Sequence, residues 1–316
     1  MSDIWSWAIF AVLLGIFLAI DLFMVQRRAG PLSLRSAFAW VAVWVTLGLG
    51  FAIFVWQTRG AEAAGLYLAG YLIEYSLSAD NVFVFAMLFA YFAVPAEHQR
   101  RLLFWGVLGA IVLRAVFILG GIALIAIFEP VIYVFGALLV ITGIKMARTV
   151  DEGMDPEANA VLRVVRRRLP VTPGYVGRAF FVRQGGRLLA TPLFAALVAV
   201  ELSDVMFAID SVPAILAITT DPFLVLTSNG FAILGLRSLY FVLAGMLDRF
   251  VYLKIGLGAI LVFAGAKMLL SSWVHLPAFV SLAVIAGILS IALVASLLAT
   301  RRHGDVQAAQ GDEQRR

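Results

Sequence analysis

The sequence YLIEYSLSADN, residues 71–81, places polar side chains in the middle of an apolar run that extends from Gly65 to Val94. This run can cross a bilayer, because about 20 apolar residues span a hydrocarbon core roughly 30 Å thick. Inside it stand Glu74, Asp80 and Asn81. Acids at the centre of a transmembrane helix cost roughly 2.5 to 3.5 kcal/mol each on insertion scales, so they indicate a functional site by default.

A second stretch, ELSDVMFAIDSVP at residues 201–213, repeats the arrangement inside the apolar run from Leu193 to Ile218. Its acids Asp204 and Asp210 are six positions apart, as are the two acids of the first stretch. In both stretches the second acid is followed by a small polar residue, which is Ser211 in this copy. Two matched sets of intramembrane acids strengthen the functional interpretation.

The composition places the chain among membrane proteins. Apolar residues make up 63% of the sequence and charged residues 14%, whereas a soluble domain carries about 25% charged residues. No cysteine is present, which excludes disulfides, thiolate metal sites and cysteine nucleophiles. The three histidines fall in predicted loops or the tail, which argues against an imidazole-built metal site within the membrane.

Hydropathy predicts an all-α polytopic membrane protein with nine transmembrane helices, at 4–25, 37–56, 64–94, 102–127, 131–147, 190–218, 229–247, 252–270 and 277–299. Arginines concentrate in alternate loops, above all in the loop at 149–189. The positive-inside rule therefore predicts an N-out, C-in orientation. We interpret the net charge of +5 as this topology signal and expect no nucleic-acid partner.

The expected order begins with two N-terminal helices (1–63), a three-helix unit (64–148) and a cytoplasmic loop (149–189). A second three-helix unit (190–271), a last helix (272–300) and a disordered cytoplasmic tail (301–316) follow. Within the loop we expect a helix from Asp155 to Arg168, with a proline at its first position. A hairpin over 180–189 should turn at Gly185-Gly186.

The three-helix units are copies of one another. GALLVITGIKM at 136–146 matches GAILVFAGAKM at 258–268, and Leu113-Arg114 corresponds to Leu236-Arg237. Each unit holds three spans, an odd number, so the copies must be inverted relative to each other. Inverted repeats with polar groups near the middle of the membrane are typical of alternating-access transporters.

Helix geometry limits what one stretch can bind alone. Six residues advance about 9 Å and lie about 120° apart on a helix, so Glu74 and Asp80 cannot chelate one ion from a straight helix. Either each copy sends one acid to a shared central site, or the helices unwind there. Pro213 favours unwinding, because it cannot donate to the carbonyl oxygen of Ile209.

The available donors are oxygens, from carboxylates, the Asn81 amide and hydroxyls such as Ser78 and Ser211. Such a set suits a hard divalent cation, namely Mn²⁺, Mg²⁺ or Ca²⁺. We expect Arg114 and Arg237 to be counter-ions to the intramembrane acids. Protons could replace the metal in the empty carrier, which predicts metal/proton exchange.

The stretches Glu74–Asn81 and Val200–Ala214 resemble the two signature stretches of the TerC family of membrane proteins, and Ala190–Leu193 and Phe223–Tyr240 extend the resemblance over nearly the whole chain. The family is named for tellurite resistance and looks like a group of manganese exporters in the lysine-exporter superfamily. Some relatives are linked to loading metal into exported proteins. The resemblance implies a protein of the bacterial inner membrane whose metal pathway is lined by Glu74, Asp80, Asn81, Glu201, Asp204 and Asp210.

The leading hypothesis is a secondary transporter that exports divalent cations, Mn²⁺ before Ca²⁺ or Mg²⁺, with no permanently bound cofactor. The alternative is a metal-delivery or assembly partner of membrane machinery that docks through the 150–189 loop. We expect no enzyme, because nothing resembling a substrate-cleaving constellation surrounds the acids. Apart from the lipid bilayer and the transported ions, a protein docked on that loop is the one partner foreseen.

Overall fold

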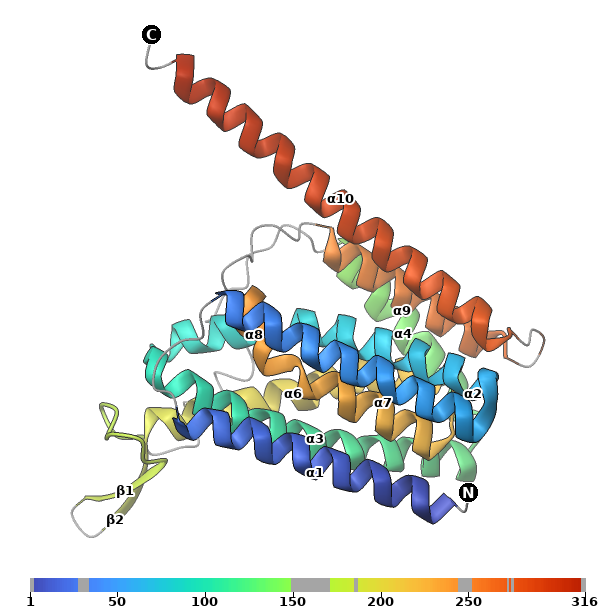
Figure 1. Ribbon diagram of the computed structural model, residues 1–316, viewed down its shortest axis with the longest axis horizontal. Coiled ribbons are helices and arrows are strands. Elements are labelled where there is room, and N and C mark those ends of the chain that lie inside the picture. Colours follow the sequence, from blue (N-terminus) through green and yellow to red (C-terminus); the bar gives the residue numbers. More distant parts are fainter. Residues whose placement is uncertain are drawn as a thin grey trace.

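The computed structural model describes residues 3–27, 34–148, 171–184, 187–243, 252–271, 273 and 276–313. It is a bundle of helices with a small hairpin at one end (Figure 1). In chain order, the elements are α1 (Asp3–Arg27), α2 (Leu34–Tyr91), α3 (Ala96–Ile127), α4 (Val131–Arg148), β1 (Phe181–Gln184), β2 (Arg187–Ala190), α6 (Pro192–Leu216), α7 (Pro222–Leu234), α8 (Leu236–Leu243), α9 (Leu253–Leu269) and α10 (Ala278–Glu313).

Within these ranges, seven helices are long and apolar enough to cross a membrane, and Ile255–Leu269 of α9 is a shorter apolar helix. The chain is therefore an all-α, multi-pass membrane protein. Each of the nine predicted ranges overlaps a helix. Two of them lie in α2, which is broken by the non-helical backbone of Gly60, with φ at 90° and ψ at 175°. Glycine adopts this positive φ without the steric cost that a Cβ brings.

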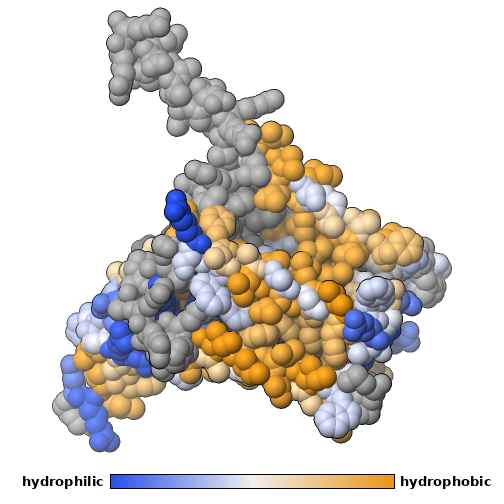
Figure 2. Space-filling model, in the orientation of Figure 1, coloured by the Kyte–Doolittle hydropathy of each residue, from blue (hydrophilic) through white to orange (hydrophobic). Residues whose placement is uncertain are grey.

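The outer surface of the bundle is apolar. Large apolar side chains such as Trp56, Val116 and Ile141 are exposed. Figure 2 shows hydrophobic residues over much of the visible face, with hydrophilic residues toward its two ends. An exposed apolar surface of this extent would be a liability in water. It is the surface that a hydrocarbon layer requires.

Helices α4 and α9 approach each other closely at glycines of the repeated sequence motif. A Cβ on Gly143 would lie 2.5 Å from the carbonyl oxygen of Gly258, and one on Gly258 would lie 2.6 Å from that of Gly143. The contact recurs between Gly136 and Gly265, where a Cβ on Gly265 would lie 2.6 Å from the carbonyl oxygen of Gly136. Glycines allow the two backbones to meet, as small residues do at membrane helix interfaces.

The loop before α6 forms the predicted hairpin. Strands β1 and β2 pair antiparallel, with Gln184 opposite Arg187, and the Tyr175 hydroxyl donates to the carbonyl oxygen of Phe92 at 2.7 Å. Burial raises the pKa of Tyr175 to about 12, so this hydroxyl keeps its proton at neutral pH. The helix predicted from Asp155 to Arg168 lies outside the described residues.

A disordered tail is expected after residue 300, and the structure describes residues 301–313 as helical. Helix α10 continues to Glu313 and projects beyond the bundle (Figure 1). Residues 301–316 contain no proline, and nine of these 16 residues are arginine, glutamine or alanine. These residues have high helix propensity, so they prolong a helix that is already nucleated.

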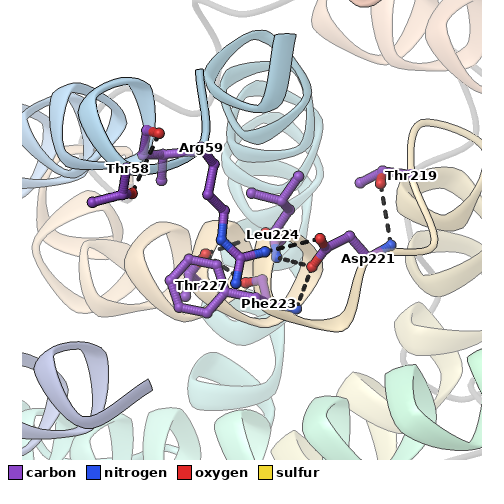
Figure 3. A network of polar contacts seen from close by, with 8 residues as sticks. Thr58, Arg59, Thr219, Asp221, Phe223, Leu224 and Thr227 are labelled. Carbon is purple, nitrogen blue, oxygen red and sulfur yellow. Dashed lines mark hydrogen bonds and ion pairs between the residues drawn. The ribbon is translucent and has the colours of Figure 1, made fainter. Parts of the chain in front are cut away.

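A polar network ties the kink in α2 to the start of α7 (Figure 3). Arg59, just before Gly60, forms an ion pair with Asp221 at 3.0 Å and lies over the ring of Phe223 at 4.3 Å. Asp221 also caps α7, because its carboxylate accepts hydrogen bonds from the backbone N–H groups of Phe223 and Leu224. The Asp221 carboxylate therefore caps the start of α7 and also holds the Arg59 side chain of α2.

Candidate functional site

A buried guanidinium joins the two sequence stretches. Arg114 of α3 forms ion pairs with Glu74 of α2 and with Asp204 of α6. Its Nη2 lies 3.0 Å from Asp204 Oδ1, and its Nε lies 3.3 Å from Oδ2. The three side chains are 1% exposed or less. Each sequence stretch therefore contributes one acid to a single charged centre, which we call the Arg114 centre.

Further polar groups complete the Arg114 centre. Glu74 accepts hydrogen bonds from Asn229 of α7 at 2.8 Å and from Ser78 at 3.2 Å. The surroundings of Asn81 orient its amide oxygen toward Arg114 Nη2 at 3.0 Å and its nitrogen toward the carbonyl oxygen of Leu77 at 3.1 Å. These bonds offset part of the cost of burying charge, which is large when a charged group lacks partners.

The structure decides between the two arrangements that helix geometry left open. Helix α6 stays helical from Pro192 to Leu216, through Pro213, so the expected unwinding at this proline is wrong. The residues from Ser211 to Leu216 are all buried. Packing against neighbouring helices holds the segment, as it does for many prolines within transmembrane helices. One acid from each stretch instead meets at Arg114, so the shared arrangement is present around an arginine.

A small cavity adjoins the Arg114 centre. Its volume is about 20 Å³, and it is lined by Leu77, Asn81, Met146, Phe207, Asp210, Ser211 and Leu261. That volume holds roughly one water molecule. Asp210 accepts a hydrogen bond from Thr142 at 3.1 Å, and the buried Ser211 hydroxyl has no hydrogen-bond partner among the described residues. Polar residues of both stretches, Asn81 from the first and Asp210 with Ser211 from the second, therefore line one small cavity.

The remaining predicted ligands stand apart or are not described. Glu201 packs against Gly109, where a Cβ would collide with its carboxylate, and its Oε2 is buried without a hydrogen-bond partner in the part of the chain described. Asp80 lies in α2, but its side chain is outside the described residues. In the described part of the chain, no three His, Cys, Asp or Glu side chains are grouped to hold a metal.

Arg237 does not have the partner expected for it. It pairs with Asp21 of α1, at 2.5 Å between Nη2 and Oδ1, and donates to the Asp21 carbonyl oxygen at 3.2 Å. The expectation that it balances the repeated acids is therefore wrong, because Asp21 lies in the first helix, outside both copies. This second buried pair is one cation against one acid.

Sequence reasoning missed Asn229, Thr142 and the role of Asp21. Each is a polar residue within an apolar run, and that signal could have found them. Asn229 also lies in the stretch from Phe223 to Tyr240 that carries the family resemblance. None of the three belongs to the matched acid motifs, so a search by repetition passes over them.

The fold and this site define an integral, multi-pass membrane protein with a buried charged centre. The sequence profile described as "Integral membrane protein TerC family" matches residues 59–304, and the chain belongs to this family.

Relatives are similar over nearly their full lengths. The "Putative membrane-bound redox modulator Alx" of Escherichia coli K12 is 51% identical over 94% of this chain and 95% of its own length. An uncharacterized membrane protein of Myxococcus xanthus is 49% identical over 93% of this chain and 92% of its own length. An uncharacterized membrane protein of Rickettsia bellii is 37% identical over 93% of this chain and 97% of its own length. No solved structure matches the chain.

Proposed function

We propose that this protein is a secondary transporter that exports divalent cations, with Mn²⁺ as the preferred substrate. One observation carries the proposal: the Arg114 centre joins an acid from each stretch, beside a cavity lined by polar residues of both stretches. Acids buried at membrane depth are expensive and mark ion pathways. A pair of stretches that served only to build a bundle would not need them.

The cavity is the proposed binding position for the ion. The Asp210 carboxylate, the Asn81 amide and the Ser211 hydroxyl line it, and Glu74, Asp204, Glu201 and Asp80 complete the pathway. These donors are hard oxygens, which suit Mn²⁺, Mg²⁺ and Ca²⁺ rather than soft metals. The buried Ser211 hydroxyl, which has no hydrogen-bond partner among the described residues, is available to ligate an ion there.

We infer inverted repeats from the contact between α4 and α9. Gly143 meets Gly258 and Gly136 meets Gly265, so each glycine of one motif touches the non-equivalent glycine of the other. A two-fold axis in the membrane plane produces this reciprocity. We propose that such repeats lie within nine helices, N-out and C-in, in the bacterial inner membrane. Repeats of this kind transport by rocking about a central site.

In this orientation the network of Arg59 and Asp221, drawn in Figure 3, belongs to the outer side, because both residues fall in or beside predicted outer loops. It ties the break in α2 to the start of α7. Protons are the proposed counter-ions. We propose no catalysis and no resident cofactor.

A second candidate is a metal-delivery or assembly partner, favoured by the exposure of Phe181 and Leu188 on the hairpin. A partner protein could dock on these side chains. The Escherichia coli relative carries a name that mentions redox modulation. This chain has no cysteine, so an effect on redox state would not pass through a thiol of its own.

The test is metal flux in proteoliposomes loaded with Mn²⁺, Mg²⁺, Ca²⁺ or Zn²⁺. Asp210→Asn should lower Mn²⁺ flux by about 100-fold, the upper end of the losses typical of changes to residues around a metal site. Asp80→Asn applies the same test to Asp80, whose side chain the structure does not describe. Glu129→Gln, at an exposed acid between α3 and α4, is the control that should keep flux. Undiminished flux in both Asp variants would refute the proposed pathway.

A hairpin variant separates the two candidates. Phe181→Ser combined with Leu188→Ser should leave flux in vesicles unchanged if the protein is an autonomous transporter. A docking protein would show no wild-type flux in vesicles and would lose its cellular activity with this change.

A further inference from the structure

Arg114 forms ion pairs with the two acids that an incoming cation would bind. Its guanidinium contacts Glu74 and Asp204 and donates to the Asn81 amide oxygen. Asn81 also lines the cavity where Asp210 and Ser211 meet. The Asn81 side chain therefore lies between the guanidinium and the proposed binding position. A charge at one of these positions acts electrostatically on the other.

The charge at this position is unbalanced. Two carboxylates against one guanidinium leave a formal charge of −1 when both acids are ionised. An arginine remains protonated at any physiological pH, so it is a permanent cation tethered to α3. A mobile cation that took a carboxylate oxygen of Glu74 or Asp204 would lie beside that positive charge, where like charges repel strongly in a low dielectric.

We propose that Arg114 is an internal cation that competes with the transported ion for Glu74 and Asp204. When no ion is bound, its guanidinium satisfies both acids, and it leaves at least one of them when the ion arrives. This inference rests on the proposed function. It assigns Arg114 a part in releasing and exchanging the ion, beyond that of a structural counter-ion.

The molecule contains a matched control. Arg237 occupies the corresponding position of the second repeat and is buried to a similar degree. It pairs with Asp21 instead of the acids of the two stretches. Changing either arginine to glutamine removes one buried positive charge, but only Arg114→Gln removes a competitor for the ion.

The experiment measures Mn²⁺ affinity by titration calorimetry on protein in lipid nanodiscs, together with the rise in unfolding temperature that Mn²⁺ produces. Arg114→Gln should bind Mn²⁺ about tenfold more tightly than wild type, within the range typical of coupled sites. Its unfolding temperature should rise more on Mn²⁺ addition, because a tighter ligand stabilises the folded state more. Arg237→Gln should bind Mn²⁺ as wild type does.

Flux adds a second readout. Arg114→Gln should transport Mn²⁺ more slowly than wild type although it binds more tightly, because nothing displaces the ion from the acids. A residue that merely positioned Glu74 and Asp204 would give weaker binding and slower transport together.

The outcomes separate this inference from the proposed function. Wild-type protein that neither binds nor transports Mn²⁺ would overturn both. Wild-type transport with unchanged or weaker binding by folded Arg114→Gln would overturn the inference alone. If Arg114→Gln does not fold, Arg114→Lys decides: a lysine keeps the charge but loses the forked geometry, so competition predicts tighter Mn²⁺ binding than in wild type, and equal or weaker binding contradicts it.

Discussion

Two buried arginines at corresponding positions of the repeat have different surroundings. Arg114 faces two acids, one from each stretch, beside a cavity. Arg237 faces one acid, Asp21, from a helix outside the repeat. The charges of a one-to-one buried pair cancel, so this pair leaves no acid free for a further cation. A centre with more acids than cations has capacity left for a further cation, and this difference supports the proposal that the Arg114 centre serves transport while Arg237 serves structure.

The largest expected effect comes from breaking the complete pair. Arg237→Ala leaves Asp21 buried without its cation, which should lower the free energy of unfolding by about 3 to 5 kcal/mol. Adding Asp21→Asn removes the stranded charge and should restore much of that loss. Unfolding by denaturant in detergent micelles measures both variants. If the double variant is no more stable than Arg237→Ala, the pair is not the source of the stability.

An intermediate effect is expected at Asn229, which donates to Glu74 at 2.8 Å. Asn229→Ala leaves a buried carboxylate oxygen without its donor, at a cost of about 1 to 3 kcal/mol in unfolding free energy. It should also weaken Mn²⁺ binding, because Glu74 loses part of its orientation. Ser228→Ala is the control, since this neighbouring hydroxyl donates to the carbonyl oxygen of Val225 in its own helix. Equal effects of the two variants would contradict the role of Asn229.

The smallest effect is expected at the Arg59–Asp221 pair, whose side chains are 20% and 38% exposed. Arg59→Gln should change the free energy of unfolding by less than about 1 kcal/mol, because water and salt screen an exposed pair. Asp221→Ala should cost more than Arg59→Gln, since it also removes the cap of α7. A larger loss for Arg59→Gln would show that the cation–π contact with Phe223 outweighs the cap.

The sequence was most informative where chemistry was repeated. The matched acids predicted a shared site, and Glu74 and Asp204 do pair with the same arginine, Arg114. The hairpin at 181–190 was also predictable, since paired glycines between short β-prone segments define a turn.

The failures have physical causes. Repetition suggested the same partner for both arginines, but α1 lies outside the repeat and supplies Asp21 to Arg237 alone. Pro213 predicted unwinding from local chemistry, whereas the buried packing around α6 keeps it helical. Asn229 and Glu74 are far apart in the sequence, so no local sequence pattern predicts that they are in contact.

The most direct test compares the two buried acids, Asp204 and Asp21, by measuring Mn²⁺ flux per folded molecule alongside stability. Asp204→Asn leaves Arg114 paired with Glu74, so stability should persist while flux is lost. Asp21→Asn should lower stability while each folded molecule still transports. The reverse pattern, or the same loss of flux per folded molecule in both variants, would contradict the assignment of transport to the Arg114 centre.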